Sequence, residues 1–333
     1  MSRLIVIALL VGLVAGGVYF FWNYRIERHY EDGKFAYLKI TSRADQSQVG
    51  QPDDRPPARA AQPTIRMATC NLSRLDERKL NNRRVSDVLV KIIPQFELVA
   101  VQGLYGPTQG AVVRLVERIN AATGRRYGFA ACAPGERDPA EEYSAFLFDE
   151  TALEVDRSTL HLVADQANRF RHPPLVAAFR VRGPAEAEAF TFTLVNVQSS
   201  PERTAAELDL LRDVFKAVRD DGRGEDDVIL LGDLGADENH LGQLTQMPDI
   251  TIAVASTPTT VRGTRRVDNI LFDRRATTEF TGRCGVVDLL RECELTMEEA
   301  LEVVEHLPVW AEFSSYEGGQ PGRVAAGAET TVR

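Results

Sequence analysis

The amino-acid sequence predicts a domain of two packed β-sheets with helices on the outside, in either an α/β or an α+β layout. Apolar, β-rich runs alternate with helical patterns along the chain, and the central apolar runs are almost unbroken, as in sheets that are covered on both faces. The 333 residues are 44% hydrophobic and 26% charged, a composition that allows a substantial core. We therefore expect one large folded domain with extensions.

The individual elements follow from the periodicity of the apolar residues. Continuous apolar runs predict strands, and apolar residues at helical spacing predict helices. The expected strands cover residues 64–72, 98–104, 143–149, 175–181, 190–198, 227–234, 266–273 and 307–313. The expected helices cover residues 84–96, 111–123 and 204–221. No internal repeat is found at solenoid periods.

The first apolar run, from Leu4 to Trp22, carries no charge and is long enough for a helix to cross about 30 Å of hydrocarbon. A cleaved signal peptide is the alternative, but the run has no A-x-A-like site and ends in the aromatic cluster "YFFW", which favours an uncleaved anchor. Arg3 precedes the run, and Arg25 and Arg28 follow it. The count of basic residues favours a cytoplasmic domain, whereas the short N-terminal tail favours export. We expect a single-pass membrane anchor with a periplasmic or otherwise extracytoplasmic domain.

Composition divides the chain into four parts. Residues 1–24 form the expected anchor, and residues 25–63 form a juxtamembrane linker rich in Pro, Gln, Asp and Ala. Residues 64–315 form the expected folded domain. Residues 316–333 have the composition of a disordered tail.

The formal net charge of −9 gives no general attraction to nucleic acid, so any such binding depends on local basic clusters. The best of these clusters is interpreted mainly as a solvated rim; it comprises Arg262, Arg265, Arg266, Arg274 and Arg275.

The four cysteines show no C-x-x-C pairing and are expected to be buried free thiols rather than a zinc site. If the domain is exported, Cys284 and Cys293 are close enough in sequence to form a disulfide.

Polar residues recur where the apolar strands end, and such side chains can converge at one rim of a sheet. Each alone is more typical of a turn or cap. The set comprises Asn71, Gln102, Gln198, Asp233, Asp268 and His306.

This set, in this order, resembles the endonuclease/exonuclease/phosphatase family with its deoxyribonuclease I-like fold. The resemblance spans residues 64–313 and rests on "IRMATCNL", "FELVAVQGL", "EEYSAFLFD", "FRHPP", "FTLVNVQSSP", "VILLGDLGADE", "TPTTVRGTRRVDNILFD" and "EVVEHLPVWAEF". It implies a four-layered α/β sandwich of two mostly antiparallel sheets. It also implies hydrolysis of phosphate esters by water with a divalent metal, usually Mg²⁺.

The resemblance assigns roles to several residues. Asn71 would orient substrate and metal ligands, and Arg171 would face the phosphate. Asp233 would orient or deprotonate the attacking water. Asp268 and His306 would pair beside the scissile phosphate. Glu142 occupies the family's acidic position before "AFLF".

Other family positions are altered. The metal-binding glutamate falls on Gly103, the family's histidine falls on Gln198, and the asparagine after the catalytic aspartate falls on Gly235. Gln198 can hydrogen-bond a phosphate but cannot exchange a proton near neutral pH, which leaves Glu142 without a cationic partner. Glu305 replaces an aspartate near the metal, as a tentative ligand. Loss of a proton-transfer residue costs roughly 10²- to 10⁴-fold in rate.

Three functions follow from this pattern. We favour a degenerate, membrane-tethered relative of the metal-dependent phosphoesterases that keeps a phosphate-binding cleft but has weak or no hydrolase activity, with Mg²⁺ binding weakened or absent. The alternative is an active Mg²⁺-dependent phosphodiesterase, nuclease or phosphatase with a rearranged metal site. The third interpretation is an interaction module whose polar strand ends only cap a stable sandwich. The sequence names no substrate and no protein partner.

Overall fold

The computed structural model describes residues 24–31, 34–42, 63–132 and 142–320, with side chains described from residue 63 onward. The chain divides into two compact units, residues 1–60 and 61–333. In the first unit, β1 (Tyr24–Glu31) and β2 (Lys34–Ser42) form an antiparallel hairpin inside the segment predicted as a linker. The predicted membrane span, residues 4–22, lies outside the described residues. Within the described residues, no helix has the length and apolar character needed to cross a bilayer.

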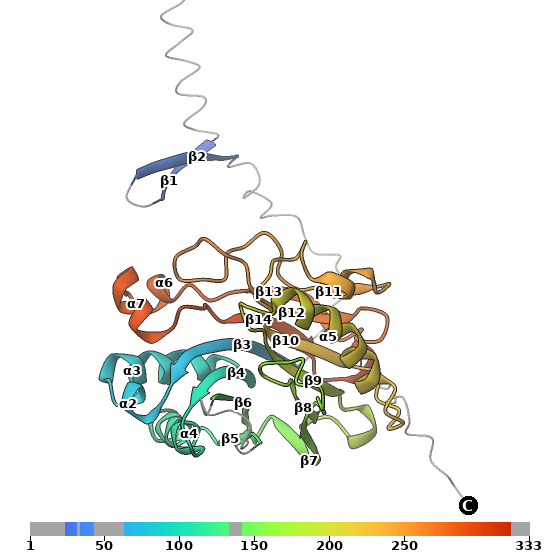
Figure 1. Cartoon of the computed structure of the whole chain (residues 1–333). Coiled ribbons are helices and arrows are strands. Elements are labelled where there is room, and N and C mark those ends of the chain that lie inside the picture. Colours follow the sequence, from blue (N-terminus) through green and yellow to red (C-terminus); the bar gives the residue numbers. More distant parts are fainter. Residues whose placement is uncertain (1–23, 32–33, 43–62, 133–141, 321–333) are drawn as a thin grey trace, which may run out of the picture. The chain divides into compact units, whose positions relative to one another are not determined.

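The second unit contains two six-stranded sheets (Figure 1). The first has the order β13-β14-β3-β4-β6-β5. Its strands are β3 (Thr64–Leu75), β4 (Leu98–Tyr105), β5 (Tyr127–Ala130), β6 (Glu142–Asp149), β13 (Phe280–Val286) and β14 (Val309–Ser314). The second has the order β11-β12-β10-β9-β8-β7. Its strands are β7 (Leu153–Leu162), β8 (Leu175–Val181), β9 (Thr191–Gln198), β10 (Val228–Asp233), β11 (Ile250–Ile252) and β12 (Asp268–Asp273).

Both sheets are mixed, because each has one parallel pair at its centre. β3 and β4 run parallel in the first sheet, and β9 and β10 run parallel in the second. All other neighbouring strands in these two sheets are antiparallel. The predicted arrangement of two packed sheets flanked by helices is confirmed. The strand pairing within each sheet is mixed, with one parallel pair among antiparallel ones.

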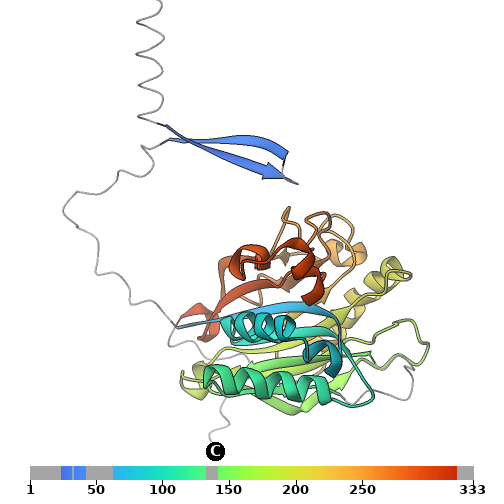
Figure 2. The same ribbon diagram turned by 90° about the vertical axis from the view of Figure 1, so that its left-hand side faces the viewer.

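The helices cover the outer faces of the two sheets, and Figure 2 shows the cyan and teal helices lying along the outer face of the first sheet. Those on the first sheet are α2 (Glu77–Leu80), α3 (Arg83–Ile92), α4 (Gly110–Thr123), α6 (Leu289–Glu292) and α7 (Met297–Val303). On the second sheet lie α5 (Thr204–Arg219) and the short η4 (Gly242–Gln246). Phenylalanine rings fill the space between the sheets, among them Phe146, Phe179 and Phe192.

Polar contacts of Gln102 and Asn196 cross this apolar interface between the sheets. Gln102 on β4 is fully buried, and its Nε2 donates to Asn196 Oδ1 on β9 at 2.7 Å. Asn196 in turn donates to the carbonyl oxygens of Val101 and Ala145 on the first sheet. A buried amide needs such partners, so these bonds favour one alignment of the two sheets.

All the expected strands and helices are present. The structure also contains more exposed edge strands that the sequence does not predict. β7 and β13 carry many half-buried or exposed side chains, so they produce no continuous apolar run. A five-residue 3₁₀ stretch, η4, and the short helices α2, α6 and α7 were likewise not expected. The three-residue η5 (Glu317–Gly319) lies inside the segment predicted as a tail.

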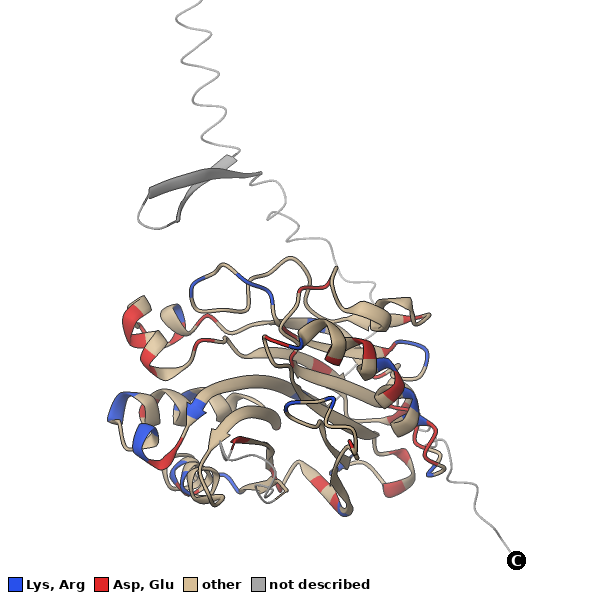
Figure 3. Ribbon diagram, in the orientation of Figure 1, with Lys and Arg blue, Asp and Glu red and all other residues tan. Residues whose placement is uncertain are grey.

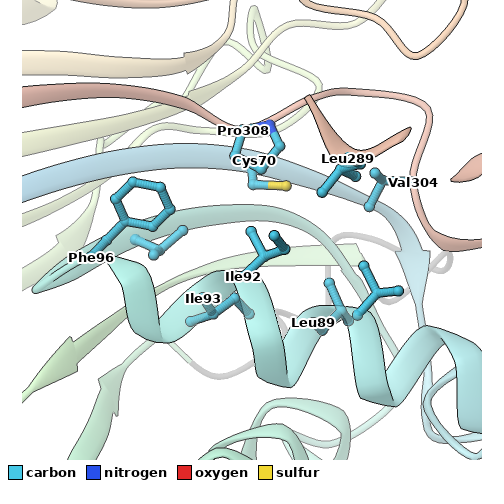
Figure 4. A pocket seen from close by; sticks show the side chains of 10 residues that line it. Cys70, Leu89, Ile92, Ile93, Phe96, Leu289, Val304 and Pro308 are labelled. Atoms are coloured by element: carbon cyan, nitrogen blue, oxygen red, sulfur yellow. The ribbon is translucent and has the colours of Figure 1, made fainter. Parts of the chain in front are cut away.

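All four cysteines are free, so the possible pairing of Cys284 with Cys293 does not occur in this structure. The expectation that they are all buried is wrong for Cys132, Cys284 and Cys293, which are half-buried. Cys70 is buried, and its sulfur faces a small apolar pocket beneath α3 whose lining includes Leu89 and Ile92 (Figure 4). Burial raises the pKa of the Cys70 thiol far above its usual range. Cys70 is therefore an unreactive core residue, as expected.

Candidate phosphoesterase site

Asn71, in the carboxyl-terminal half of β3, and Asp233, at the carboxyl end of β10, lie together. Asn71 Nδ2 donates to Asp233 Oδ2 at 3.0 Å, although the two residues are far apart in sequence. The other Asp233 oxygen accepts the backbone N–H of Gly235 at 3.0 Å. Asn71 Oδ1 accepts the backbone N–H of Ser73 at 2.9 Å, which fixes the amide orientation. Asp233 is thus held by donors on both oxygens.

His306 and Asp268 form the second pair of this cluster. His306 Nδ1 lies 2.9 and 3.0 Å from the two carboxylate oxygens of Asp268 and 3.8 Å from Asp233 Oδ2. Asp268, at the start of β12, also accepts the hydroxyl of Thr259 at 2.8 Å. Asp268 is 1% exposed, so its charge needs these partners.

The electrostatics of the cluster follow from burial of two carboxylates beside one imidazole. Burial and repulsion by Asp268 raise the pKa of Asp233 to about 6, although His306 opposes this rise. Burial alone would lower the pKa of His306, but Asp268 and Asp233 outweigh it and raise that pKa to about 9. His306 is therefore a cation at neutral pH.

A second polar group joins three strands at the same rim. Gln198, at the end of β9, donates from Nε2 to Glu142 Oε1 at 2.7 Å and accepts the backbone N–H of Gly103 at 3.2 Å. His172 lies on the other oxygen of Glu142, with Nε2 to Oε2 at 3.7 Å. Glu142 therefore has an imidazole beside it, a neighbour that the expectation of a Glu142 without a cationic partner did not include. His172 stands next to Arg171 in "FRHPP" but was not among the expected site residues.

Gly103 leaves no room for a longer side chain in this geometry. Its φ is +66°, and a Cβ atom built there would lie 2.5 Å from Asn71 Oδ1 and 3.1 Å from the backbone nitrogen of Ser73. The space next to the expected glutamate position is thus filled by the amide that holds Asp233. The structure gives no metal ligand at this position.

The remaining predicted residues lie at the periphery of these two groups. Gly235, with φ +67°, packs near Thr204 and contributes its N–H to Asp233. Glu305 is exposed, and its backbone N–H donates to Ser73 Oγ at 2.9 Å. The backbone N–H of Arg171 donates to Glu207 Oε1 at 2.7 Å, which fixes the loop that carries both Arg171 and His172.

An open groove adjoins the cluster and is lined by Gly235, Asp237, His240, Arg265 and Arg266. Arg266 forms ion pairs with Asp237 at 3.3 Å and with Glu238 at 3.1 Å.

Beyond the groove, Arg274 and Arg275 both pair with Asp249. Basic residues are spread over several elements of the domain rather than gathered on one face (Figure 3). The ion pairs of Arg266, Arg274 and Arg275 with nearby acidic residues agree with the interpretation of this basic cluster as a solvated rim.

Asp233, Asp268 and His306 could hold a metal ion, since their ligand atoms lie within 4.8 Å of one another. Protonated His306 already offsets one of the two carboxylate charges, so a metal bound there would compete with the proton on His306. Glu305 belongs to none of the potential metal groups among the described residues.

Comparison with known proteins finds similar sequences among deoxyribonuclease I-like proteins. Human deoxyribonuclease-1-like 2 is 27% identical over 190 residues, which cover 52% of this chain and 62% of that protein. The mouse deoxyribonuclease-1-like 2 is 24% identical over 264 residues, covering 76% and 92%, respectively. Rat deoxyribonuclease gamma is 26% identical over 271 residues, which cover 74% of this chain and 83% of that protein. No family model matches the sequence.

Solved structures agree on the fold. A humanized D. rerio TDP2 superposes with a TM-score of 0.52 at 12% identity, covering 75% of this chain and 99% of that one. The human nocturnin catalytic domain superposes with a TM-score of 0.52 at 14% identity. The superposition covers 77% of this chain and 95% of that domain. The chain therefore has the fold of the endonuclease/exonuclease/phosphatase family. More particularly, its relatives in sequence are deoxyribonuclease I-like proteins, which confirms the resemblance.

Proposed function

We propose that the domain binds phosphate esters at the cluster of Asn71, Asp233, Asp268 and His306, and that it hydrolyses them weakly or not at all. The observation that carries this proposal is the closed space at Gly103, because the family's metal-binding glutamate has no counterpart there. Cationic His306, with Arg171 on the neighbouring loop, supplies positive charge for a phosphate without a metal. Mg²⁺ binding at the cluster would be weak.

Binding is tested by calorimetric titration of the full chain with inorganic phosphate and with a nucleoside monophosphate. We expect binding that weakens about 10-fold or more in Arg171→Ala, because one charge-assisted hydrogen bond contributes roughly 1.5–3 kcal/mol. Arg274→Ala, on the rim, is the matched control and should bind as the wild type does. Equal affinity in the wild type and Arg171→Ala would contradict the proposed cleft.

Hydrolysis is tested with bis(p-nitrophenyl) phosphate and with plasmid DNA in Mg²⁺ or Mn²⁺. We expect the wild type to be no faster than Asp233→Ala. A wild-type rate that is 10²-fold higher and depends on Asp233 would overturn the weak-hydrolase proposal.

An active phosphoesterase with a rearranged site is the second candidate, and one contact favours it. His172 lies against Glu142 and could transfer the proton that Gln198 cannot. This candidate requires that the Asp233-dependent rate, if present, also falls in His172→Gln. DNA is one possible substrate for it, because several relatives are named deoxyribonucleases.

We also propose that residues 4–22 tether the domain to a membrane, with the domain on the extracytoplasmic side. This proposal rests on the uncharged apolar run and its aromatic end. Membrane fractionation of the full chain, followed by protease accessibility of the domain in intact cells, tests both the anchor and its orientation.

A further inference from the structure

A second acidic cluster lies at the opposite end of β10 from Asp233. Asp227 immediately precedes the strand, Glu279 precedes β13, and Glu317 lies in η5. One carboxylate oxygen from each lies within 4.8 Å of the other two. The six residues of β10 separate this cluster from Asp233 by about 20 Å, so it is not part of the phosphoesterase site.

The acidic cluster is buried rather than solvated. Asp227 is 1% exposed and Glu279 is 2% exposed, whereas Glu317 is half-buried. Burial and mutual repulsion raise the pKa of Asp227 to about 9 and that of Glu317 to about 7. Within the part of the chain that the structure describes, no Lys, Arg or His forms a salt bridge with any of the three.

Several oxygens in and around this cluster have no hydrogen-bond partner. Asp227 Oδ1 and Glu279 Oε2 are both buried and unpartnered. The hydroxyl of Thr277, a residue that is 1% exposed, lies beside Asp227 and also lacks a hydrogen bond of good geometry. Buried polar atoms are rarely left unsatisfied, and each orphan carboxylate oxygen is a ready ligand for a cation.

Hydrogen bonds fix the segments that carry Asp227 and Glu279. Glu279 Oε1 accepts the backbone N–H of Gly318, next to Glu317, and the carbonyl of Glu279 accepts the N–H of Ser314 at 2.8 Å. The carbonyl of Asp227 accepts the N–H of Thr193 at 2.8 Å. Asp227 Oδ1 and Glu279 Oε2 accept no hydrogen bond of good geometry from any donor among the described residues.

We propose that Asp227, Glu279 and Glu317 bind a divalent cation with oxygen ligands, Ca²⁺ in particular, that fastens η5 to the start of β10. All-oxygen donor sets suit hard cations, and the ligand spacing is no wider than two Ca²⁺–O distances of about 2.4 Å. The proposal does not depend on the phosphoesterase function, because it uses none of the residues of that site.

The test is calorimetric titration of the chelator-treated full chain with CaCl₂, with thermal unfolding in parallel. We expect saturable Ca²⁺ binding and a rise of about 5 °C in the unfolding midpoint at 1 mM Ca²⁺, since a ligand stabilises the state that binds it. MgCl₂ at the same concentration should produce a smaller rise. Absence of any Ca²⁺-dependent rise up to 10 mM would overturn the proposal, and the carboxyl groups would then be neutralised by protons alone.

Isosteric variants assign the bound ion to this cluster. Asp227→Asn and Glu279→Gln keep the side-chain shape and should each weaken Ca²⁺ binding at least 10-fold. Asp233→Asn is the matched control, because it changes a buried carboxylate at the other end of the same strand and should keep the full thermal shift. Loss of the shift in Asp233→Asn but not in Asp227→Asn would place the ion at the phosphoesterase site and overturn the proposal. Should a buried variant fail to fold, half-buried Glu317→Gln must show the same weakened binding.

Discussion

The two ends of strand β10 carry buried carboxylates in contrasting surroundings. At its carboxyl end, Asp233 and Asp268 share one cation, His306, and Asn71 and Thr259 add hydrogen bonds. At its amino end, Asp227 and Glu279 face each other and Glu317 with orphan oxygens and no basic partner among the described residues.

The difference shows how one strand can present the same chemical group in two states. A buried carboxylate is stable only when it is paired or protonated, or when it binds an ion. The carboxyl end has its counter-charge built into the chain, whereas the amino end lacks one. We therefore expect the first end to depend on pH through an imidazole and the second to depend on added cations.

The largest expected effect is at the carboxyl end. Asp268→Ala removes the carboxylate that binds His306 and leaves a buried imidazolium, which should cost about 3 kcal/mol of unfolding free energy in urea denaturation. Asp237→Ala is the control, because it breaks only solvent-exposed ion pairs, with His240 and Arg266, and should cost far less stability. An equal decrease in unfolding free energy in both variants would mean that the buried Asp268–His306 pair stabilises the fold no more than an exposed pair does.

The next effect is the pH dependence that His306 causes. Its pKa is raised in the folded state to about 9, so its contribution to stability is complete below its unfolded pKa of 6.5 and is lost as pH rises through about 9. The contribution is at most about 3 kcal/mol. Unfolding free energies measured at pH 6, 8 and 10 should fall more steeply in the wild type than in His306→Gln. Parallel curves would contradict this assignment.

A smaller effect is expected at the amino end, where stability again falls as pH rises but the substitution should stabilise the protein. The raised pKa of Asp227 means that its contribution is lost as pH rises from about 4 through about 9. Asp227→Asn removes the ionisable group, so in metal-free buffer at pH 8 the variant should be more stable than the wild type by about 1–2 kcal/mol. Chemical denaturation checks this, and a less stable variant would mean that the carboxylate has a counter-charge after all.

The smallest effect concerns Gly103, whose backbone packs against Asn71. Gly103→Ala places a Cβ 2.5 Å from Asn71 Oδ1 at a positive φ, whereas Gly124→Ala has a similar φ and no neighbour within 4 Å. Both variants should lose about 1 kcal/mol from backbone strain. Gly103→Ala should lose more, and the excess should shrink in an Asn71→Ala background, where the tight contact with the backbone nitrogen of Ser73 at 3.1 Å remains. A double-mutant cycle by urea denaturation measures this coupling.

Much of the fold is predictable from the sequence because buried strands need continuous apolar residues. β9 and β10 are examples, with almost every side chain buried. β7 escapes prediction because it lies at a sheet edge with half-exposed side chains, and its regularity comes from pairing with β8. A hairpin within residues 24–42 is likewise stabilised by pairing rather than by an apolar pattern.

The site is predictable where strand ends supply it and much less so where a loop does. Asn71, Asp233 and Asp268 stand at the ends of buried strands, so their approach follows from the sheets. His172 lies in a loop between β7 and β8, and no spacing in the sequence relates it to Glu142. The acidic cluster is likewise not predictable from the sequence, because its members come from three segments that only tertiary packing brings together.

The bond between Gln102 and Asn196 has a consequence for the whole rim. Sliding one sheet across the other by a single residue pair would break this bond and leave amide groups stranded among phenylalanine rings. The relative position of the two sheets is therefore fixed by a hydrogen bond in the buried interface between them rather than by contacts at the surface. Substitutions at the rim, such as those at 103, 198 and 235, can then change the chemistry while the surviving groups stay opposite one another.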